Sequence, residues 1–130
     1  MSMTVPVLPD TDVLVDYFRG QPAAVELIQS CSSRIILSAI VVAELYAGVR
    51  GNTERSTLDA FISLFRIIPV DAEIAWTGGL LKRDYARSHG VGLADAIVAA
   101  TVVTANAELK TLNTKHYPMF AGLKPAYRKP

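Results

Sequence analysis

Residues 5–14 of the chain read VPVLPDTDVL, and this stretch determines the fold that we expect. Its first half, Val5 to Leu8, is a short apolar run typical of a strand, although prolines interrupt and follow it. Asp10 or Thr11 then begins a helix, because short side chains that carry oxygen cap helix N-termini. A strand that passes directly into a helix is the repeating unit of α/β proteins.

The same strand-to-helix pattern returns further along the chain. Arg34 to Leu37 predicts a second strand, followed by a helix that Ser38 caps. Ile67 to Val70 predicts a third strand before a long helix, and Glu108 to Thr111 predicts a fourth. We therefore expect residues 1–130 to form a single α/β domain with a mainly parallel sheet.

Length and composition restrict the class of protein. Of the 130 residues, 51% are apolar, which is enough to form a hydrophobic core. We expect Trp76 to lie in this core, and we expect a last short strand near Leu123. The single cysteine, Cys31, has no partner in the chain, and no basic residue precedes Arg19 as in a secretory signal, so a cytoplasmic location is expected. The longest uncharged stretch, 96–107, is too short to cross a membrane.

Charge is unevenly divided along the chain, although the net charge is only +1. Residues 1–108 contain 8 basic and 12 acidic residues, whereas residues 109–130 contain 5 basic and no acidic ones. The near-neutral total argues against general coating of nucleic acid, but the basic C-terminal strip could contact phosphates locally. A solubilising role explains this strip equally well. Its members are Lys110, Lys115, Lys124, Arg128 and Lys129.

Three carboxylates follow positions where the chain enters a helix. Asp10 lies after the first strand, at the edge where parallel sheets bind ligands. Glu44 has apolar neighbours one helical turn away on both sides, which predicts an apolar setting for its charge. Asp95 lies in the first turn of a helix predicted over Leu93 to Ala105. Capping explains Asp10 and Asp95 equally well when each is taken alone.

A divalent cation is needed if one fold brings these three carboxylates together. Two like charges about 4 Å apart repel by roughly 4 kcal/mol at an effective dielectric constant near 20. Oxygen ligands favour Mg²⁺, with Mn²⁺ as an alternative, and the chain has no Cys or His pair at the spacing of a zinc site. It also has no glycine-rich nucleotide loop.

Four segments, in their order and spacing, extend this interpretation over nearly the whole chain. They are residues 8–14 (LPDTDVL), 42–48 (VAELYAG), 93–100 (LADAIVAA) and 111–117 (TLNTKHY). Together they resemble the PIN domain, and within it the VapC-type toxins of bacterial toxin–antitoxin pairs. The resemblance implies a three-layer α/β/α sandwich with a mainly parallel central sheet.

The resemblance also implies a metal-dependent endoribonuclease. Asp10, Glu44 and Asp95 match the family's first three acidic positions, and Thr11 matches the small hydroxyl residue beside the first acid. Asp10 and Asp95 would hold Mg²⁺, with Glu44 as a further ligand or as the base that orients water. An activated water would then cleave the RNA phosphodiester, leaving 3′-hydroxyl and 5′-phosphate ends.

The fourth acidic position of many family members falls at His116, so the acidic quartet is incomplete here. His116 could contact the RNA phosphate, hold a water or be a surface residue. Asn113 and Lys115 are further candidates for contact with the substrate or support of the metal ligands. The partners that the resemblance implies are RNA, a second copy in a homodimer, and a small antitoxin bound over the first helices. No membrane is expected.

Two other functions remain open at this point. Asp10-Thr11-Asp12-Val13 after an apolar strand also fits the nucleophile motif of haloacid dehalogenase-like phosphatases, in which Asp12 would be essential and Glu44 incidental. No later paired-Asp motif supports that alternative. The third possibility is a non-catalytic PIN-like interaction module, in which His116 marks lost activity.

Overall fold

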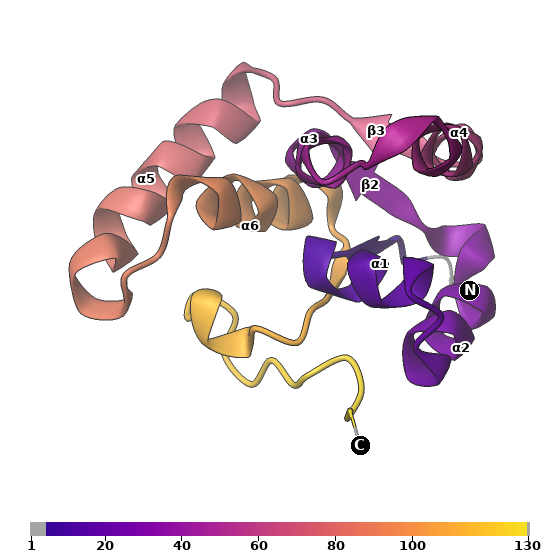
Figure 1. Ribbon diagram of the computed structural model, residues 1–130. Helices are drawn as coiled ribbons and strands as arrows, with labels where there is room; N and C mark the ends of the chain where they lie inside the picture. Colours follow the sequence, from indigo (N-terminus) through magenta and orange to yellow (C-terminus); the bar gives the residue numbers. More distant parts are fainter. Residues whose placement is uncertain (1–4, 130) are drawn as a thin grey trace.

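The computed structural model describes residues 5–129 as four short strands among six α-helices (Figure 1). The strands are β1 (Val7–Pro9), β2 (Ile36–Ser38), β3 (Arg66–Ile68) and β4 (Glu108–Lys110). The helices are α1 (Thr11–Phe18), α2 (Pro22–Ser30), α3 (Ala39–Ala47), α4 (Gly51–Ile62), α5 (Ala72–His89) and α6 (Leu93–Ala105), with 3-10 turns at Ser32–Arg34 and Thr114–His116.

All strand pairs are parallel. β1 pairs with β4 and β2 pairs with β3, and a parallel bridge between Val7 and Ile35 joins the two pairs, so the order is β3-β2-β1-β4. β1 is therefore central, and its Val7 and Leu8 are almost fully buried. The carboxyl ends of β1 and β4 lie side by side, because Pro9 is in register with Lys110. The segments that leave these two strands must therefore meet at one edge.

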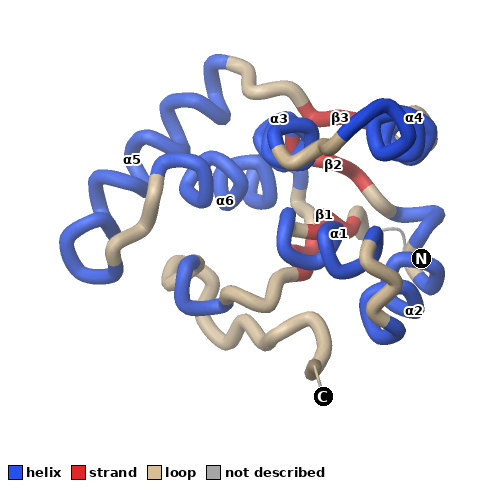
Figure 2. Tube along the Cα trace, in the orientation of Figure 1, coloured by secondary structure: helices blue, strands red, loops and turns tan. Residues whose placement is uncertain are grey.

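Helices flank the strands on two sides. α5 and α6 pack against each other on one side, and α1 to α4 gather on the other, while the short strands lie between them (Figures 1 and 2). Gly78 permits the close approach of α5 to α6, because a Cβ atom there would lie 3.0 Å from the Ile97 side chain. The α/β fold with parallel strands confirms the predicted class.

Local capping explains where the helices begin. The Ser38 hydroxyl accepts a hydrogen bond from the Ile40 amide (3.1 Å), and the Asp71 carboxylate accepts one from the Ile74 amide (2.9 Å). Asp10 does the same for α1. Each cap satisfies an amide that has no partner within its helix, so α1 and α3 begin directly after β1 and β2, and α5 begins after a short connection from β3.

Two finer expectations were wrong. Trp76 is 61% exposed, because α5 turns Ile74 and Gly78 inward and leaves the indole on its outer face. No strand forms near Leu123 in the described residues, where the chain makes turns and meets the end of β4 through one backbone hydrogen bond, from the Ala126 amide to the Thr111 carbonyl (2.9 Å). The Leu123 amide instead donates a hydrogen bond to the Phe120 carbonyl (3.2 Å), which closes a turn.

Within residues 5–129, no helix combines the length and the apolar character needed to cross a bilayer.

Candidate metal centre

Asp10 is the most buried of the three predicted acids. It directly follows β1 and is 6% exposed. Its Oδ1 accepts a hydrogen bond from the Thr11 amide (2.9 Å), while Oδ2 accepts one from the Thr111 hydroxyl (3.0 Å) and one from the Tyr117 hydroxyl (2.8 Å). Three donors from two distant parts of the chain thus compensate for the burial of one negative charge.

Asp95 and Asp10 both contact the hydroxyl of Tyr117. Gly92 is the N-cap of α6, so Asp95 occupies the first turn of that helix, where a negative charge is favoured. Its Oδ1 is 3.4 Å from the Tyr117 hydroxyl, and its Oδ2 is 3.2 Å from Nδ1 of His116. The structure therefore brings two of the predicted acids within 3.4 Å of one tyrosine hydroxyl.

Glu44 joins this group from α3. Its Oε1 accepts a 2.6 Å hydrogen bond from the hydroxyl of Thr11, the residue next to Asp10. Glu44 is exposed, which corrects the expectation that its apolar neighbours would bury it. Of those neighbours only Val41 is buried, and Gly48 lies with Glu44 in an open groove. Glu44 therefore faces solvent at the rim of the site.

The charges of the cluster act on one another. Burial, and after it the negative charge of Asp10, raises the pKa of Asp95 above its ordinary value; Glu44 adds to the rise, while His116 and the Tyr117 hydroxyl oppose it. Burial and the charges of Asp10 and Asp95 also raise the pKa of Tyr117 far above its ordinary value, so its hydroxyl keeps its proton. Such mutual repulsion favours a bound cation.

The donor set fits Mg²⁺ better than a metal that needs a closed protein cage. Among residues 5–129, no three His, Cys, Asp or Glu side chains converge tightly enough to enclose an ion. Mg²⁺ does not require this, because it usually keeps several waters and binds one or two carboxylates. Asp10 and Asp95, both within reach of one hydroxyl, supply that pair.

Comparison with known proteins identifies the family. The PIN domain pattern matches residues 7–119. The chain is 41% identical over 124 residues to Ribonuclease VapC19 of Mycobacterium tuberculosis, which covers 92% of this chain and 98% of the relative. Ribonuclease VapC10 of the same organism is 37% identical over 127 residues, 95% of each chain.

The chain belongs to the PIN-domain family, among the VapC proteins. A solved toxin–antitoxin complex from Klebsiella pneumoniae contains a chain that superposes with a TM-score of 0.82 at 27% identity, covering 95% of this chain and 99% of the other. The resemblance found in the sequence is thus confirmed.

Asp12 in this PIN domain borders the carboxylate cluster, because the Thr111 hydroxyl lies 3.0 Å from Asp10 Oδ2 and 3.4 Å from Asp12 Oδ2. Its Oδ2 accepts a hydrogen bond from the Leu112 amide (2.9 Å), and its Oδ1 accepts one from the Val13 amide (2.8 Å). Burial, the largest influence, raises the pKa of Asp12. Asp12 therefore ties the loop after β4 to the start of α1, a role that sequence reasoning did not foresee.

The remaining predicted residues of the PIN site lie on the loop after β4. Asn113, Lys115 and His116 are all exposed, and only His116 contacts one of the three acids. Sequence reasoning missed Tyr117 as a residue of the site. The feature that could have revealed it is its hydroxyl group, which lies in the last of the four family-like segments. Because its partners lie 107 and 22 residues away, sequence spacing alone does not reveal them.

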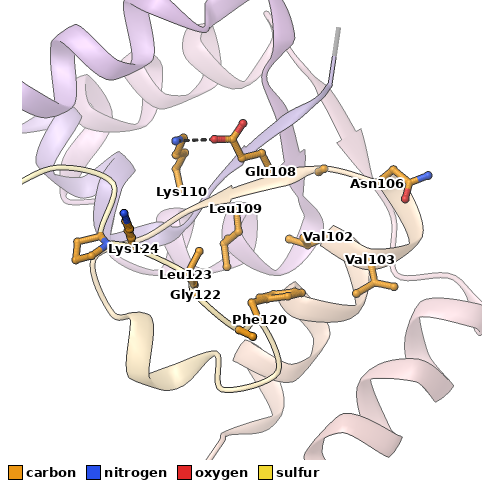
Figure 3. A pocket seen from close by; sticks show the side chains of 13 residues that line it. Val102, Val103, Asn106, Glu108, Leu109, Lys110, Phe120, Gly122, Leu123 and Lys124 are labelled. Atoms are coloured by element: carbon orange, nitrogen blue, oxygen red, sulfur yellow. Dashed lines mark ion pairs between the residues drawn. The ribbon is translucent and has the colours of Figure 1, made fainter. Parts of the chain in front are cut away.

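The basic C-terminal strip is partly neutralised within the VapC-like domain. Lys110 pairs with Glu108 (2.7 Å) and Lys129 pairs with Asp16 (2.9 Å). A cavity of about 680 Å³ beside β4 has Lys110 and Lys124 in its wall, with Phe120 and Leu123 (Figure 3). None of the three acids lines it, so this cavity is separate from the candidate metal centre.

Asp95→Asn tests the charge balance of the cluster. Because the folded-state pKa of Asp95 is raised, its ionised form costs stability at pH values above that pKa, and the cost disappears below the unfolded value near 3.8. In EDTA, Asp95→Asn should therefore have a higher free energy of unfolding than the native sequence at pH 7. Urea unfolding should show this advantage shrinking as the pH falls toward 4.

Asp84→Asn, at a half-exposed residue of α5, is the matched control and should change stability by less than about 0.5 kcal/mol. Equal loss of stability in both variants at pH 7 would contradict the account.

Proposed function

We propose that this chain is a Mg²⁺-dependent endoribonuclease and the toxin of a toxin–antitoxin pair. The observation that carries the proposal is that the Asp10 and Asp95 carboxylates both lie within 3.4 Å of the Tyr117 hydroxyl, with Glu44 bound to Thr11, the neighbour of Asp10. Family membership supports it, because relatives 41% and 37% identical are named ribonucleases. The structural neighbour from Klebsiella belongs to a toxin–antitoxin complex.

Each residue of the cluster has a distinct task in this proposal. Asp10 and Asp95 hold the cation, and when bound it supplies a water of lowered pKa and neutralises negative charge on the phosphate. One carboxylate oxygen of Glu44 accepts the hydrogen bond from the Thr11 hydroxyl. The other oxygen is therefore available to orient the attacking water and to accept its proton. Thr11 fixes the direction of Glu44.

The exposed residues of the loop after β4 face the substrate side of the proposed site. When both of its ring nitrogens carry a proton, His116 can donate one hydrogen bond to Asp95 (3.2 Å) and another to a phosphate oxygen. Lys115 adds a positive charge that attracts RNA without reading its sequence. Asn113 offers an amide donor on the same loop.

The contacts of Asp12 disfavour the phosphatase alternative. That reaction needs Asp12 free to move a proton at the substrate, but both of its oxygens accept backbone hydrogen bonds. In the nuclease, by contrast, Asp10 and Glu44 carry the chemistry.

Cleavage assays separate these functions. With purified RNA and Mg²⁺, the native chain should cleave, whereas EDTA or Asp10→Asn should lower the rate by about 100-fold or more. Glu44→Gln should also lower the rate strongly, because the water loses its base. Asp12→Asn should lower it less, since Asp12 supports the loop.

Circular dichroism should confirm that each variant is folded. Equal cleavage by the native chain, the EDTA sample and Asp10→Asn would indicate a contaminating nuclease and overturn the proposal. No cleavage at all by the native chain would favour the non-catalytic module.

We also propose that a segment of the antitoxin binds the groove between α1, α3 and α4. This groove of about 670 Å³ has apolar walls and reaches Glu44, so an occupant would also cover the rim of the site. Its apolar lining comes from three helices and the loop between α3 and α4, and comprises Val15, Phe18, Leu45, Val49 and Leu58; charged residues also line it, namely Arg19, Glu44, Arg50 and Glu54. A homodimer stays a prediction.

Filling the groove tests the antitoxin proposal. Thr57 lines it on α4 and is exposed, so Thr57→Trp should place an indole in the groove without disturbing the core. When the chain is co-expressed with an antitoxin that the native chain retains, affinity purification of this variant should recover at least about tenfold less of that antitoxin. Ser88→Trp, at an exposed residue of α5, is the control. If both variants retain the same amount of antitoxin, the antitoxin binds elsewhere.

A further inference from the structure

Tyr117 is a buried tyrosine whose hydroxyl contacts two acids of the candidate metal centre. Its ring is 1% exposed and stacks on Phe120, with ring centroids 6.3 Å apart. We infer that Tyr117 is a positioning residue, whose hydroxyl holds the Asp10 and Asp95 carboxylates at the spacing that a divalent cation needs. This inference rests on the proposed function, because it concerns the same metal site.

The hydroxyl distances suit one strong and one weak interaction. Tyr117 carries one hydroxyl proton, and it lies 2.8 Å from Asp10 Oδ2 and 3.4 Å from Asp95 Oδ1. The proton therefore makes its shorter hydrogen bond to Asp10 and a weak second one to Asp95, which lies at the outer limit of hydrogen bonding. A dipole between two repelling carboxylates reduces the cost of keeping them close.

Packing does not explain the hydroxyl. A phenylalanine would fill the same core position and stack on Phe120 without burying a polar atom, which is costly unless it is hydrogen-bonded. In the described part of the chain, the partners of this hydroxyl are Asp10 and Asp95. The polar atom thus serves the two carboxylates and not the core.

The surrounding loop fixes Tyr117 from its backbone. The Tyr117 amide donates a hydrogen bond to the Thr114 carbonyl (3.0 Å) and closes the turn Thr114–His116. Upstream, the Leu112 amide is held by Asp12 (2.9 Å). A short segment with fixed ends therefore holds the Tyr117 hydroxyl beside the carboxylates. A group that orients metal ligands must itself be held in place in this way.

Tyr117→Phe is the direct test, with Tyr127→Phe as its matched control. Tyr127 also donates its hydroxyl to an aspartate, Asp16 Oδ2 at 2.6 Å, on the last turns of α1, and that aspartate is none of the three predicted acids. Isothermal titration of the full chain with Mg²⁺ should show affinity weakened about 10- to 100-fold in Tyr117→Phe. The affinity of Tyr127→Phe should equal that of the native chain.

The Mg²⁺ dependence of RNA cleavage supplies a second readout. The rate of Tyr117→Phe should be low at limiting Mg²⁺ and recover toward the native rate at saturating Mg²⁺, which a loss of packing would not produce. If the native chain binds Mg²⁺ and Tyr117→Phe binds it equally tightly, the inference is wrong while the proposed function stands. If the native chain binds no Mg²⁺, both fail.

A labelled native side chain makes the test independent of the folding of Tyr117→Phe. The chain with 3-fluorotyrosine placed at position 117 keeps its hydroxyl, and its fluorine resonance should shift in a saturable way as Mg²⁺ is added. The same label at position 127 should not shift. An unmoved resonance at 117, at Mg²⁺ concentrations that calorimetry shows to be saturating, would overturn the inference.

Discussion

The fold depends on the burial of one charge, the carboxylate of Asp10. A carboxylate in the interior is costly unless donors surround it. Here the first amide of α1, the Thr111 hydroxyl after β4 and the Tyr117 hydroxyl all donate to it. These contacts join the central strand, the first helix and the C-terminal loop, so the group that anchors the fold is also the first acid of the candidate metal centre.

This arrangement gives the acids opposite effects on stability and function. The Asp10 charge raises the pKa of Asp95 and makes the ionised pair costly, although burial of Asp95 is the larger influence. The same repulsion makes the pair attractive to a divalent cation. In the proposed metal site, Asp95 would thus destabilise the isolated chain and strengthen cation binding, an exchange of local stability for activity that is typical of functional sites.

Much of the fold could be predicted from local sequence signals. Ser38 and Asp71 cap helices because capping depends on the nearest few residues, and the strand-to-helix order follows from them. Trp76 was misplaced because amphipathicity does not say which helix face finds a neighbour. The strand expected near Leu123 is absent because the chain turns there, with the Leu123 amide bonded to the Phe120 carbonyl.

The candidate site divides in the same way. Asp10 and Asp95 were found from their places beside helix starts, Glu44 from its apolar neighbours, and all three from family-like segments; the structure places them around one cluster. The exposure of Glu44 and the function of Tyr117 depend on contacts across the fold, and no local pattern contains them. Sequence therefore predicted which acids to examine, and the structure shows what links them.

The most direct measurement of the central claim is a crystal structure of the full chain grown with Mn²⁺, which replaces Mg²⁺ at oxygen sites and scatters anomalously. The account predicts an anomalous peak in contact with the carboxylates of both Asp10 and Asp95. A peak bound elsewhere, or no peak at these two residues at millimolar Mn²⁺, would contradict it.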